Sequence, residues 1–418
     1  MCDYAHFKEN KKFLIYAHSS WYKSKPNEYS VLDCSRTKPL DVGGIETRYL
    51  DAIVAGKDTK SIDQSLSGIL TSEKEKVNVR IEAANLLGLR FNRKFDEAKT
   101  EALEKVSKLQ LELGNGEVDA NAIFKAILDE ATHGIEVKEE VDALVKASMS
   151  SDPSLKVAIV RNLYSMSELA GRTDIKEVLL RLLKDDDQNV RNITAIALVW
   201  LSDSQWSDIY KPLVQALNEA RLKQWNDKEL YEKTLTTFGV SVSRTANTEK
   251  EKIETVRILY NMIDEISDPY NKSDVIRELG LKKKLATWTT PKLLEVLKST
   301  NDYHKNTIIE ALGEIEAKEA LEGIKSYIKD KDCYVVVSVI EAVYKIDPDG
   351  FSEFFKNKAM PEMKARFEKC YFQFALALSG LGPAAKDMKP FLLEKYKTAK
   401  DDGSSASFLL ENTIESLQ

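Results

Sequence analysis

The stretch DDDQNVRNITAIALVWL, Asp185 to Leu201, sets three acids before an almost unbroken apolar run. This run is shorter than the about 20 apolar residues of a membrane span, and it carries Arg191 and Asn192 near its start. A buried helix is the better interpretation, with Asp187 placed to accept from the free N–H groups of its first turn. The buried stripe predicted for this helix comprises Val190, Ile193, Ala197, Trp200 and Leu201.

Another helix is predicted directly before the acidic turn Lys184 to Asp187. Its apolar residues follow the spacing of one helical face, and they are Ile175, Val178, Leu179, Leu182 and Leu183. Helix, acidic turn and helix together form a hairpin. The chain has only 17 Gly and 10 Pro in 418 residues, and this scarcity of turn residues favours long helices over an all-β fold.

The hairpin recurs along the chain, which predicts a repeat architecture. In four hairpins an acid or amide lies three residues before the first inward position of the second helix; these residues are Asp152, Asp187, Asn301 and Asp332. Further hairpins are predicted at Trp206 to Phe238 and Glu249 to Ala286, and an earlier second helix at Val79 to Leu89. Two-helix units of roughly 30 to 45 residues build an α-solenoid, in which stacked neighbours bury the face that one hairpin leaves open.

Two of the second helices resemble HEAT repeats. The resemblance is carried by Asp187-x-x-Val190-Arg191-x-x-Thr194-Ala195-x-Ala197-Leu198 and by Val79-Arg80-x-x-Ala83-Ala84-x-Leu86-Leu87. The segment Leu381 to Lys397 is similar to the short HEAT-like repeats of bacterial, bilin-lyase type proteins. The resemblance covers about residues 60–418 and implies an all-α fold: a right-handed α-solenoid of stacked antiparallel helical hairpins, about eight or nine in number. Lys156 and Lys305 depart from the pattern, because they stand where Arg191 follows its anchor.

The domain organisation follows from where the repeat begins. Residues 1–55 lack it and are predicted to form an irregular N-terminal cap, and residues 56–418 form the HEAT-like solenoid. A break is possible near 113–119, where the sequence LGNGEVD follows a long predicted helix that starts near Phe95. The aromatic stripe Phe367, Tyr371 and Phe374, with Leu378, is interpreted as core.

The net charge limits which partners are expected, and the cysteines and the N-terminal residues indicate in which compartment the protein is found. The net charge of −6 gives no global attraction for polyanions. The N-terminal residues do not have the pattern of a signal peptide, and the cysteines lack CxxC spacing, so free thiols in the cytoplasm are expected; the cysteines are Cys2, Cys34, Cys333 and Cys370. A lipid anchor on Cys2, or export, is expected only if the true start lies upstream.

Nothing in the sequence predicts catalysis. None of the four histidines is followed by Glu, so the HE pairs with which HEAT-like hydroxylases bind iron are missing, as is HExxH. No GxSxG or phosphate-binding loop is present, and no cleft of the kind used by HEAT-like alkylpurine glycosylases can be assembled. We therefore expect no catalytic residue, no metal and no cofactor.

The resemblance implies a non-catalytic scaffold or adaptor that binds a protein partner on the concave face lined by the second helices. The candidate contacts are Arg80, Glu82, Arg161, Arg191, Asn192, Glu310 and Glu341. The alternative is a nucleic-acid-binding solenoid with a local basic patch made of Arg277, Lys282, Lys283, Lys284 and Trp288. A third possibility is a repeat-built platform for an enzyme that resides in another chain.

Overall fold

The computed structural model of the chain describes residues 59–113, 138–165, 173–202, 208–300, 304–401 and 406–417, together with four short strands near the N-terminus. The chain divides into two compact units, unit 1 from Met1 to Trp206 and unit 2 from Ser207 to Gln418. Asn301 and residues 114–119 lie outside the described residues, so the break predicted near 113–119 stays a prediction.

Unit 1 begins with two pairs of two-residue antiparallel strands. Strand β1 (Phe13–Leu14) pairs with β4 (Lys38–Pro39), and β2 (His18–Ser19) pairs with β3 (Tyr29–Ser30). The helices of unit 1 are α2 (Thr59–Thr71), α3 (Val77–Leu113), α5 (Lys138–Ala147), α6 (Pro153–Ser165), α7 (Thr173–Leu182) and α8 (Gln188–Ser202). The two helices predicted around Val79 to Leu113 are one continuous helix, α3, of 37 residues.

Unit 2 is built from helices alone in the part that the structure describes. Its α-helices are α9 (Tyr210–Leu222), α10 (Lys228–Thr245), α11 (Glu249–Glu265), α12 (Pro269–Gly280), α13 (Thr290–Ser299), α14 (Lys305–Glu314), α15 (Leu321–Lys325), α16 (Cys333–Ile346), α17 (Pro348–Phe354), α18 (Met360–Leu381), α19 (Lys389–Asp401) and α20 (Ala406–Ser416). Short 3-10 segments lie at Lys283–Thr289, Lys318–Ala320, Ser326–Lys329 and Gly382–Met388, and one π-helical turn lies at Phe355–Ala359.

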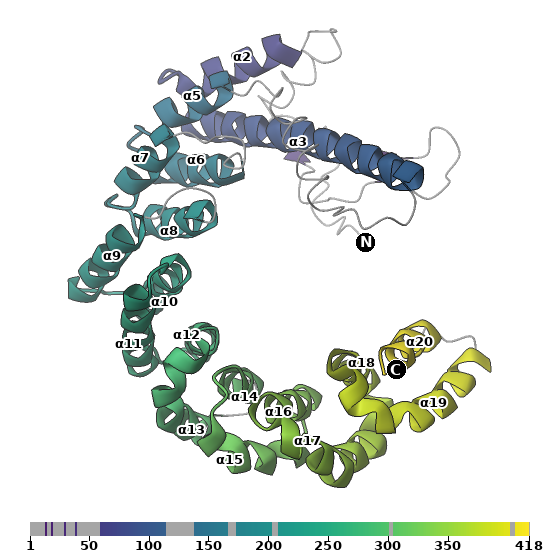
Figure 1. The fold of residues 1–418 in the computed structure, drawn as a ribbon. Helices are drawn as coiled ribbons and strands as arrows, with labels where there is room; N and C mark the ends of the chain where they lie inside the picture. The colour runs from purple at the N-terminus through teal and green to yellow at the C-terminus, as the bar shows by residue number, and fades with distance from the viewer. Residues whose placement is uncertain are drawn as a thin grey trace. The chain divides into compact units, whose positions relative to one another are not determined.

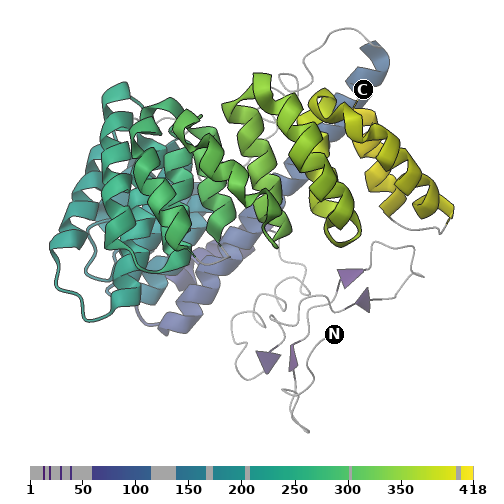
Figure 2. The ribbon, with the colours of Figure 1, turned by 90° about the horizontal axis from the view of Figure 1, so that it is seen from below.

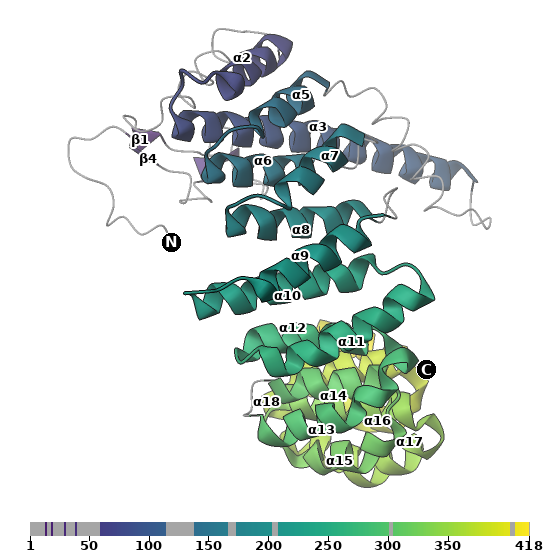
Figure 3. The same cartoon turned by 90° about the vertical axis from the view of Figure 1, so that its left-hand side faces the viewer.

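The helices stack as antiparallel hairpins, which confirms the α-solenoid class. In unit 1, the second helices α3, α6 and α8 pack on one another in sequence, as Figure 3 shows. In unit 2, the second helices α10, α12, α14, α16, α18 and α20 do the same. Figure 2 shows the helices of unit 2 following one another from teal through green to yellow. Within each unit the second helices line the inner side of the curve and the first helices line the outer side (Figure 1).

The acids of the opening stretch have separate roles in this stack. Asp187 Oδ1 accepts from the backbone N of Val190 at 3.1 Å and so caps α8. Asp185 Oδ2 binds Lys156 Nζ of the preceding hairpin at 2.6 Å, and its Oδ1 accepts from the backbone N of Asp187 at 3.0 Å. Asp186 is exposed. One acid therefore holds the previous hairpin and another starts the next helix.

The same arrangement of a lysine and two turn acids occurs in unit 2. Lys305 Nζ lies 3.2 Å from Asp330 Oδ2, and Asp330 Oδ1 accepts from the backbone N of Asp332 at 3.0 Å. Asp332 in turn caps α16 through the backbone N of Tyr334 at 2.9 Å. Lys156 and Lys305 are the residues that depart from the HEAT pattern. Both bind the turn of the following hairpin, so the departure preserves the contact between neighbours.

The cores of both units are apolar and include points of very close helix approach. A Cβ added at Gly313 of α14 would lie 2.8 Å from the Cα of Ala342 of α16, and one added at Gly280 of α12 would lie 2.9 Å from the Cα of Ala311. No side chain fits at these contacts without moving backbone, so glycine sets the separation of the second helices there.

The buried stripe predicted for α8 is wrong at two positions. Val190 and Ala197 are fully buried, but Ile193 is only half-buried and Trp200 is 59% exposed. The buried face instead includes Thr194, whose hydroxyl donates to the carbonyl of Val190 at 2.7 Å. The physical reason is that α8 buries its face against both α6 and α7, which rotates the stripe relative to a pattern of apolar residues alone.

The prediction of free thiols is wrong for two cysteines. Cys333 and Cys370 form a disulfide, with Cα atoms 5.8 Å apart and a sequence separation of 37. The separation is about one repeat, and stacking of the second helices brings such residues together. Since disulfides persist mainly in oxidising compartments, these cysteines give no support to a reducing one.

Candidate partner-binding surface

An exposed ridge runs along the inner side of α6 and α8 in unit 1. Arg161 of α6 is exposed, and Ile196 and Trp200 of the neighbouring helix α8 are large exposed apolar side chains. The ring of Trp200 lies 5.6 Å from the ring of Tyr164 on α6, centroid to centroid. We call Arg161, Tyr164, Ile196 and Trp200 the unit 1 ridge. It combines an aromatic pair with an Arg, the residue types that dominate protein interfaces.

Two of the candidate contacts in unit 1 are internal rather than exposed. Arg80 is buried, and its Nε donates to the carbonyl of Leu70 at 2.8 Å, near the last turn of α2. Asn192 is also buried and accepts from Gln188 Nε2 at 3.1 Å. Both satisfy polar groups inside the hairpin stack, so neither is available for a partner. The prediction is therefore corrected at these two positions.

Glu82 and Arg191, the other two candidates of unit 1, are half-buried. Arg161 is the only residue of this predicted group in unit 1 whose side chain is exposed in the described structure.

The two candidates of unit 2 lie together. Glu310 of α14 and Glu341 of α16 lie close enough for the charges of Glu310 and Glu314 to act on Glu341, and Glu310 accepts from the Ser338 hydroxyl at 2.8 Å. Lys345 Nζ lies 2.7 Å from Glu314 Oε1. Burial raises the pKa of the Glu341 carboxyl; Lys345 opposes this shift, and the charges of Glu310 and Glu314 add to it. We call Glu310, Glu314 and Glu341 the acidic edge. Lys345 is the lysine that the structure pairs with this group of three carboxyls.

Exposed apolar side chains lie on α16 and α18 as well. It consists of Tyr334 at the start of α16 and of Phe372 and Leu376 on α18, which are 56%, 50% and 52% exposed. The sequence places Phe372 and Leu376 four residues apart, on the side of α18 opposite to the buried Phe367, Phe374 and Leu378. Their spacing relative to that core stripe is the signal by which sequence reasoning could have found them. Tyr371, predicted as core, is partly exposed.

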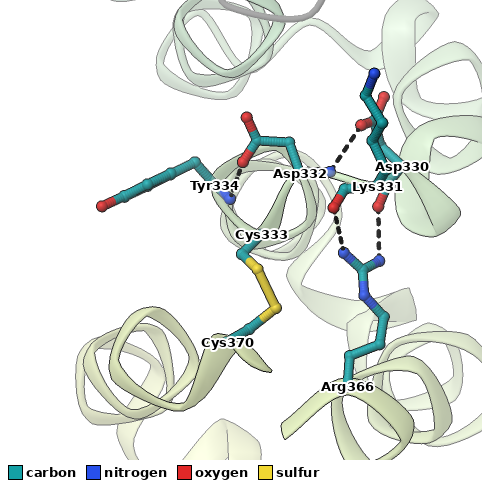
Figure 4. The surroundings of a disulfide bond; sticks show 7 residues. All are labelled: Asp330, Lys331, Asp332, Cys333, Tyr334, Arg366 and Cys370. Carbon is teal, nitrogen blue, oxygen red and sulfur yellow. Dashed lines mark hydrogen bonds between the residues drawn. A yellow bond between two sulfur atoms is a disulfide. The ribbon is translucent and has the colours of Figure 1, made fainter. Parts of the chain in front are cut away.

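A disulfide and an Arg clamp fix α16 against α18 (Figure 4). Cys333 is the first residue of α16, and Cys370 lies where the backbone of α18 departs from helical angles, with φ −119° and ψ 18°. Arg366 donates from Nη1 to the carbonyl of Asp330 at 2.6 Å and from Nη2 to that of Lys331 at 3.1 Å. Tyr334 projects away from the disulfide in Figure 4. The helix that carries Tyr334 and the helix that carries Phe372 are thus held in register.

The predicted basic patch is largely committed to contacts within the chain. Lys282 Nζ donates to the carbonyl of Ser243 at 2.7 Å, and burial lowers its pKa. Lys284 lies 3.2 Å from Glu316, and Arg277 lies 2.7 Å from Asp274. Trp288 is half-exposed and packs against the ring of Tyr260. Lys283 is exposed. Phosphate contacts would have to compete with these internal pairs.

No catalytic constellation is visible among the described residues. His304 makes structural contacts: its Nδ1 lies 2.6 Å from the Ser273 hydroxyl, and its ring packs edge-on against Tyr270. In the same part of the chain, no group of three or more His, Cys, Asp and Glu side chains is arranged to hold a metal ion. Nor does any described helix combine the length and apolarity that crossing a bilayer demands.

Comparison with known proteins finds structures but no sequence family. No family model matches the chain, and no curated protein matches it. An engineered protein is 16% identical over 85% of this chain and 98% of its own, with a TM-score of 0.39. Kap121p is 13% identical over 91% of this chain and 49% of its own, with a TM-score of 0.39, and Kap121p bound to Ste12p gives 0.38. This chain thus matches about half of the length of Kap121p.

Proposed function

We propose that the chain is a non-catalytic, HEAT-like scaffold or adaptor that binds a protein partner on the inner face of its second helices. The observation that carries this proposal is the exposure of Trp200, a residue whose burial the sequence predicts, against Tyr164 of α6, the inner helix of unit 1 that also carries the exposed Arg161. Exposed Trp and Arg side chains in one patch are the residue types on which binding energy concentrates.

The repeated turn geometry supports the HEAT-like assignment. Asp152, Asp187 and Asp332 each cap a second helix, and Lys156 and Lys305 each bind the following turn. A stack held by such contacts presents a regular row of inner ridges, and repeat solenoids use rows of this kind as extended binding surfaces. On this proposal Arg161, Glu310 and Glu341 are contact residues, and the interior positions Arg80 and Asn192 are not.

Site-specific photo-crosslinking tests the proposal. A benzophenone amino acid is placed at Ile196 on the inner side of unit 1 or, as the matched control, at Glu177, an exposed position on the outer helix α7. The full chain is irradiated in extract of its native cell, with and without nuclease. We expect a discrete protein adduct at Ile196, resistant to nuclease, and none at Glu177. Equal labelling of both positions, or adducts that vanish with nuclease, contradicts the proposal.

A second variant separates binding from folding. Trp200→Ala removes an exposed side chain, so its cost in unfolding free energy is small, within about 0.5 to 1 kcal/mol. We expect the same variant to abolish the adduct at Ile196. Loss of the adduct together with a large loss of stability would indicate a structural role for Trp200 instead.

A further inference from the structure

The inner surface of unit 2 is divided by polarity into two parallel strips. The acidic edge, Glu310, Glu314 and Glu341, lies on α14 and α16, and the apolar pair Phe372 and Leu376 lies on α18. The two strips are neighbours, because α16 packs against α14 on one side and against α18 on the other. An occupant that covers both strips must itself have one charged and one apolar side.

The orientation of each strip follows from the contacts of its helix. On α16, Ser338 and Lys345 face α14, where they bind Glu310 and Glu314, and Cys333 faces α18. On α18, Cys370 faces α16 and Ser379 faces α20, where its hydroxyl lies 3.2 Å from that of Thr413. Leu376, six residues after Cys370 and three before Ser379, points between these two directions and is exposed, so it lies on the inner ridge of α18, as Glu341 lies on that of α16. Phe372 lies seven residues before Ser379, on the same side of the helix, and is exposed at the edge of this ridge nearer α20.

We propose that this surface binds an amphipathic helix of the protein partner, with lysines or arginines along the edge that meets α14 and apolar residues along the edge that meets α18. The inference rests on the proposed function and names the chemistry of the partner. The charge match is direct, since three carboxylates with one paired lysine attract cations. Side chains repeating every three or four residues on α16 and α18 form the ridges against which another helix packs.

The disulfide makes this surface a preformed one. Cys333 precedes Tyr334, and Cys370 lies two residues before Phe372, so the covalent bond holds both ridges at a fixed separation. A surface ordered before binding loses less conformational entropy when the partner arrives. The occupant thus finds Tyr334, Glu341 and Phe372 already in place.

The test measures binding of three synthetic peptides to the full chain by fluorescence anisotropy. The probe is an amphipathic leucine–lysine peptide of about five helical turns; the controls are its leucine–glutamate counterpart and a scrambled leucine–lysine peptide without an apolar face. We expect the probe to bind at least about 10-fold more tightly than either control, a difference of about 1.4 kcal/mol. Equal binding of all three peptides overturns the proposal.

Variants of the protein assign the binding to this surface. Glu310→Gln with Glu341→Gln should weaken binding of the probe about 10-fold at low salt and have little effect at about 0.5 M salt, where exposed charges are screened. Phe372→Ala should weaken it about 10-fold or more at both salt concentrations. The matched control, Glu319→Gln with Glu322→Gln, removes two exposed acids near and on α15, on the outer side, and should leave binding unchanged.

The outcomes separate this inference from the proposed function. If Glu319→Gln with Glu322→Gln weakens binding of the probe as much as Glu310→Gln with Glu341→Gln does, the peptide is attracted only by the overall negative charge of the chain, and the inference fails. If the probe does not bind while photo-crosslinking at Ile196 still captures a protein, the scaffold proposal stands and the inferred partner chemistry is wrong. If neither experiment detects binding, both proposals fail.

Discussion

Lys156 and Asp185 form an ion pair between successive hairpins, with 2.6 Å between Nζ and Oδ2 and side chains that are 15% and 10% exposed. Asp185→Asn removes the charge but keeps an oxygen that can accept from the backbone of Asp187. It leaves the Lys156 ammonium without its counter-charge in a largely buried position, so we expect a loss of about 1 to 3 kcal/mol in the unfolding free energy.

Urea denaturation measures this loss, and the neighbouring residue provides the control. Asp186→Asn changes an exposed acid of the same turn and should cost no more than about 0.5 kcal/mol. Equal effects of the two substitutions would show that the overall charge of the turn, rather than the ion pair, matters.

The Cys333–Cys370 disulfide closes a loop of 37 residues between α16 and α18. Replacing both cysteines by alanine is expected to lower the unfolding free energy of unit 2 by about 2 to 4 kcal/mol, chiefly because the unfolded chain gains freedom. Hydrogen exchange should report the change locally, with faster exchange in α16 and α18 than in α10. Dithiothreitol should reproduce the effect in the original chain and add little in the variant; unchanged exchange in the variant would contradict the prediction.

The contact between Gly313 and Ala342 predicts a penalty for the smallest added side chain. Gly313→Ala places a methyl group 2.8 Å from the Cα of Ala342, so α14 and α16 must separate, at a cost of about 1 to 3 kcal/mol. At Gly380 of α18 no atom lies within 4 Å of the added Cβ. Gly380→Ala should therefore leave stability unchanged or raise it by up to about 1 kcal/mol. Thermal unfolding of the two variants distinguishes these outcomes.

Glu232 makes unit 2 sensitive to acid. Burial disfavours the charge of this carboxyl, but hydrogen bonds from the Ser267 hydroxyl and from the backbone N of Asp268 and Ser267 outweigh burial, so its pKa is lowered. A lowered folded-state pKa contributes stability that is present above the unfolded-state value of about 4.3 and is lost as the pH falls through the folded-state value.

The prediction concerns the difference between the original chain and Glu232→Gln. We expect the original to be more stable at pH 7, with the gap in unfolding free energy narrowing as the pH drops below about 4.3. Glu229→Gln, an exposed change on the same helix, should show no such pH-dependent gap. A gap that stays constant from pH 7 to acid would mean that the carboxylate charge of Glu232 is not the source of the stabilisation.

Because most residues of the basic patch contact other parts of the chain, we expect it to bind nucleic acid only weakly. Since Lys282 and Lys284 are engaged with Ser243 and Glu316, we expect a single-stranded oligonucleotide to bind no more tightly than in non-specific binding at physiological salt, with a Kd of about 10⁻⁴ to 10⁻⁶ M. Replacing Lys283 and Lys284 by alanine should leave this affinity nearly unchanged. Tighter binding with a steep salt dependence that the substitutions abolish would favour the nucleic-acid alternative.

The helices and their turns could be predicted because their causes are local. Apolar residues at helical spacing predict α7 and α8, and an acid before the second helix supplies the cap that Asp187 and Asp332 provide in the structure. Lys156 and Lys305 depart from the HEAT pattern in residue type but stand at the same position of the second helix as Arg191. Their hairpins can therefore still be recognised from the sequence. What a residue does within its own hairpin follows from a few neighbours in sequence.

The candidate surface could be predicted only in part. The reasoning that selects Glu310 and Glu341 as polar residues on second helices also selects Arg80 and Asn192, which are buried. It also assigned Trp200 to the core and passed over Phe372. Which side of a helix faces solvent depends on the rotation that packing against two neighbours imposes, and apolar spacing alone does not distinguish a buried stripe from an exposed one.

The sequence by itself determined the repeating hairpin, since helix propensity, spacing and capping act over a few residues. The tertiary structure alone decided the pairing of Lys156 with Asp185, the disulfide between Cys333 and Cys370, and the meeting of Glu310 with Glu341. Each of these joins residues about one repeat apart, and only the stacking of one hairpin on the next brings their side chains within reach.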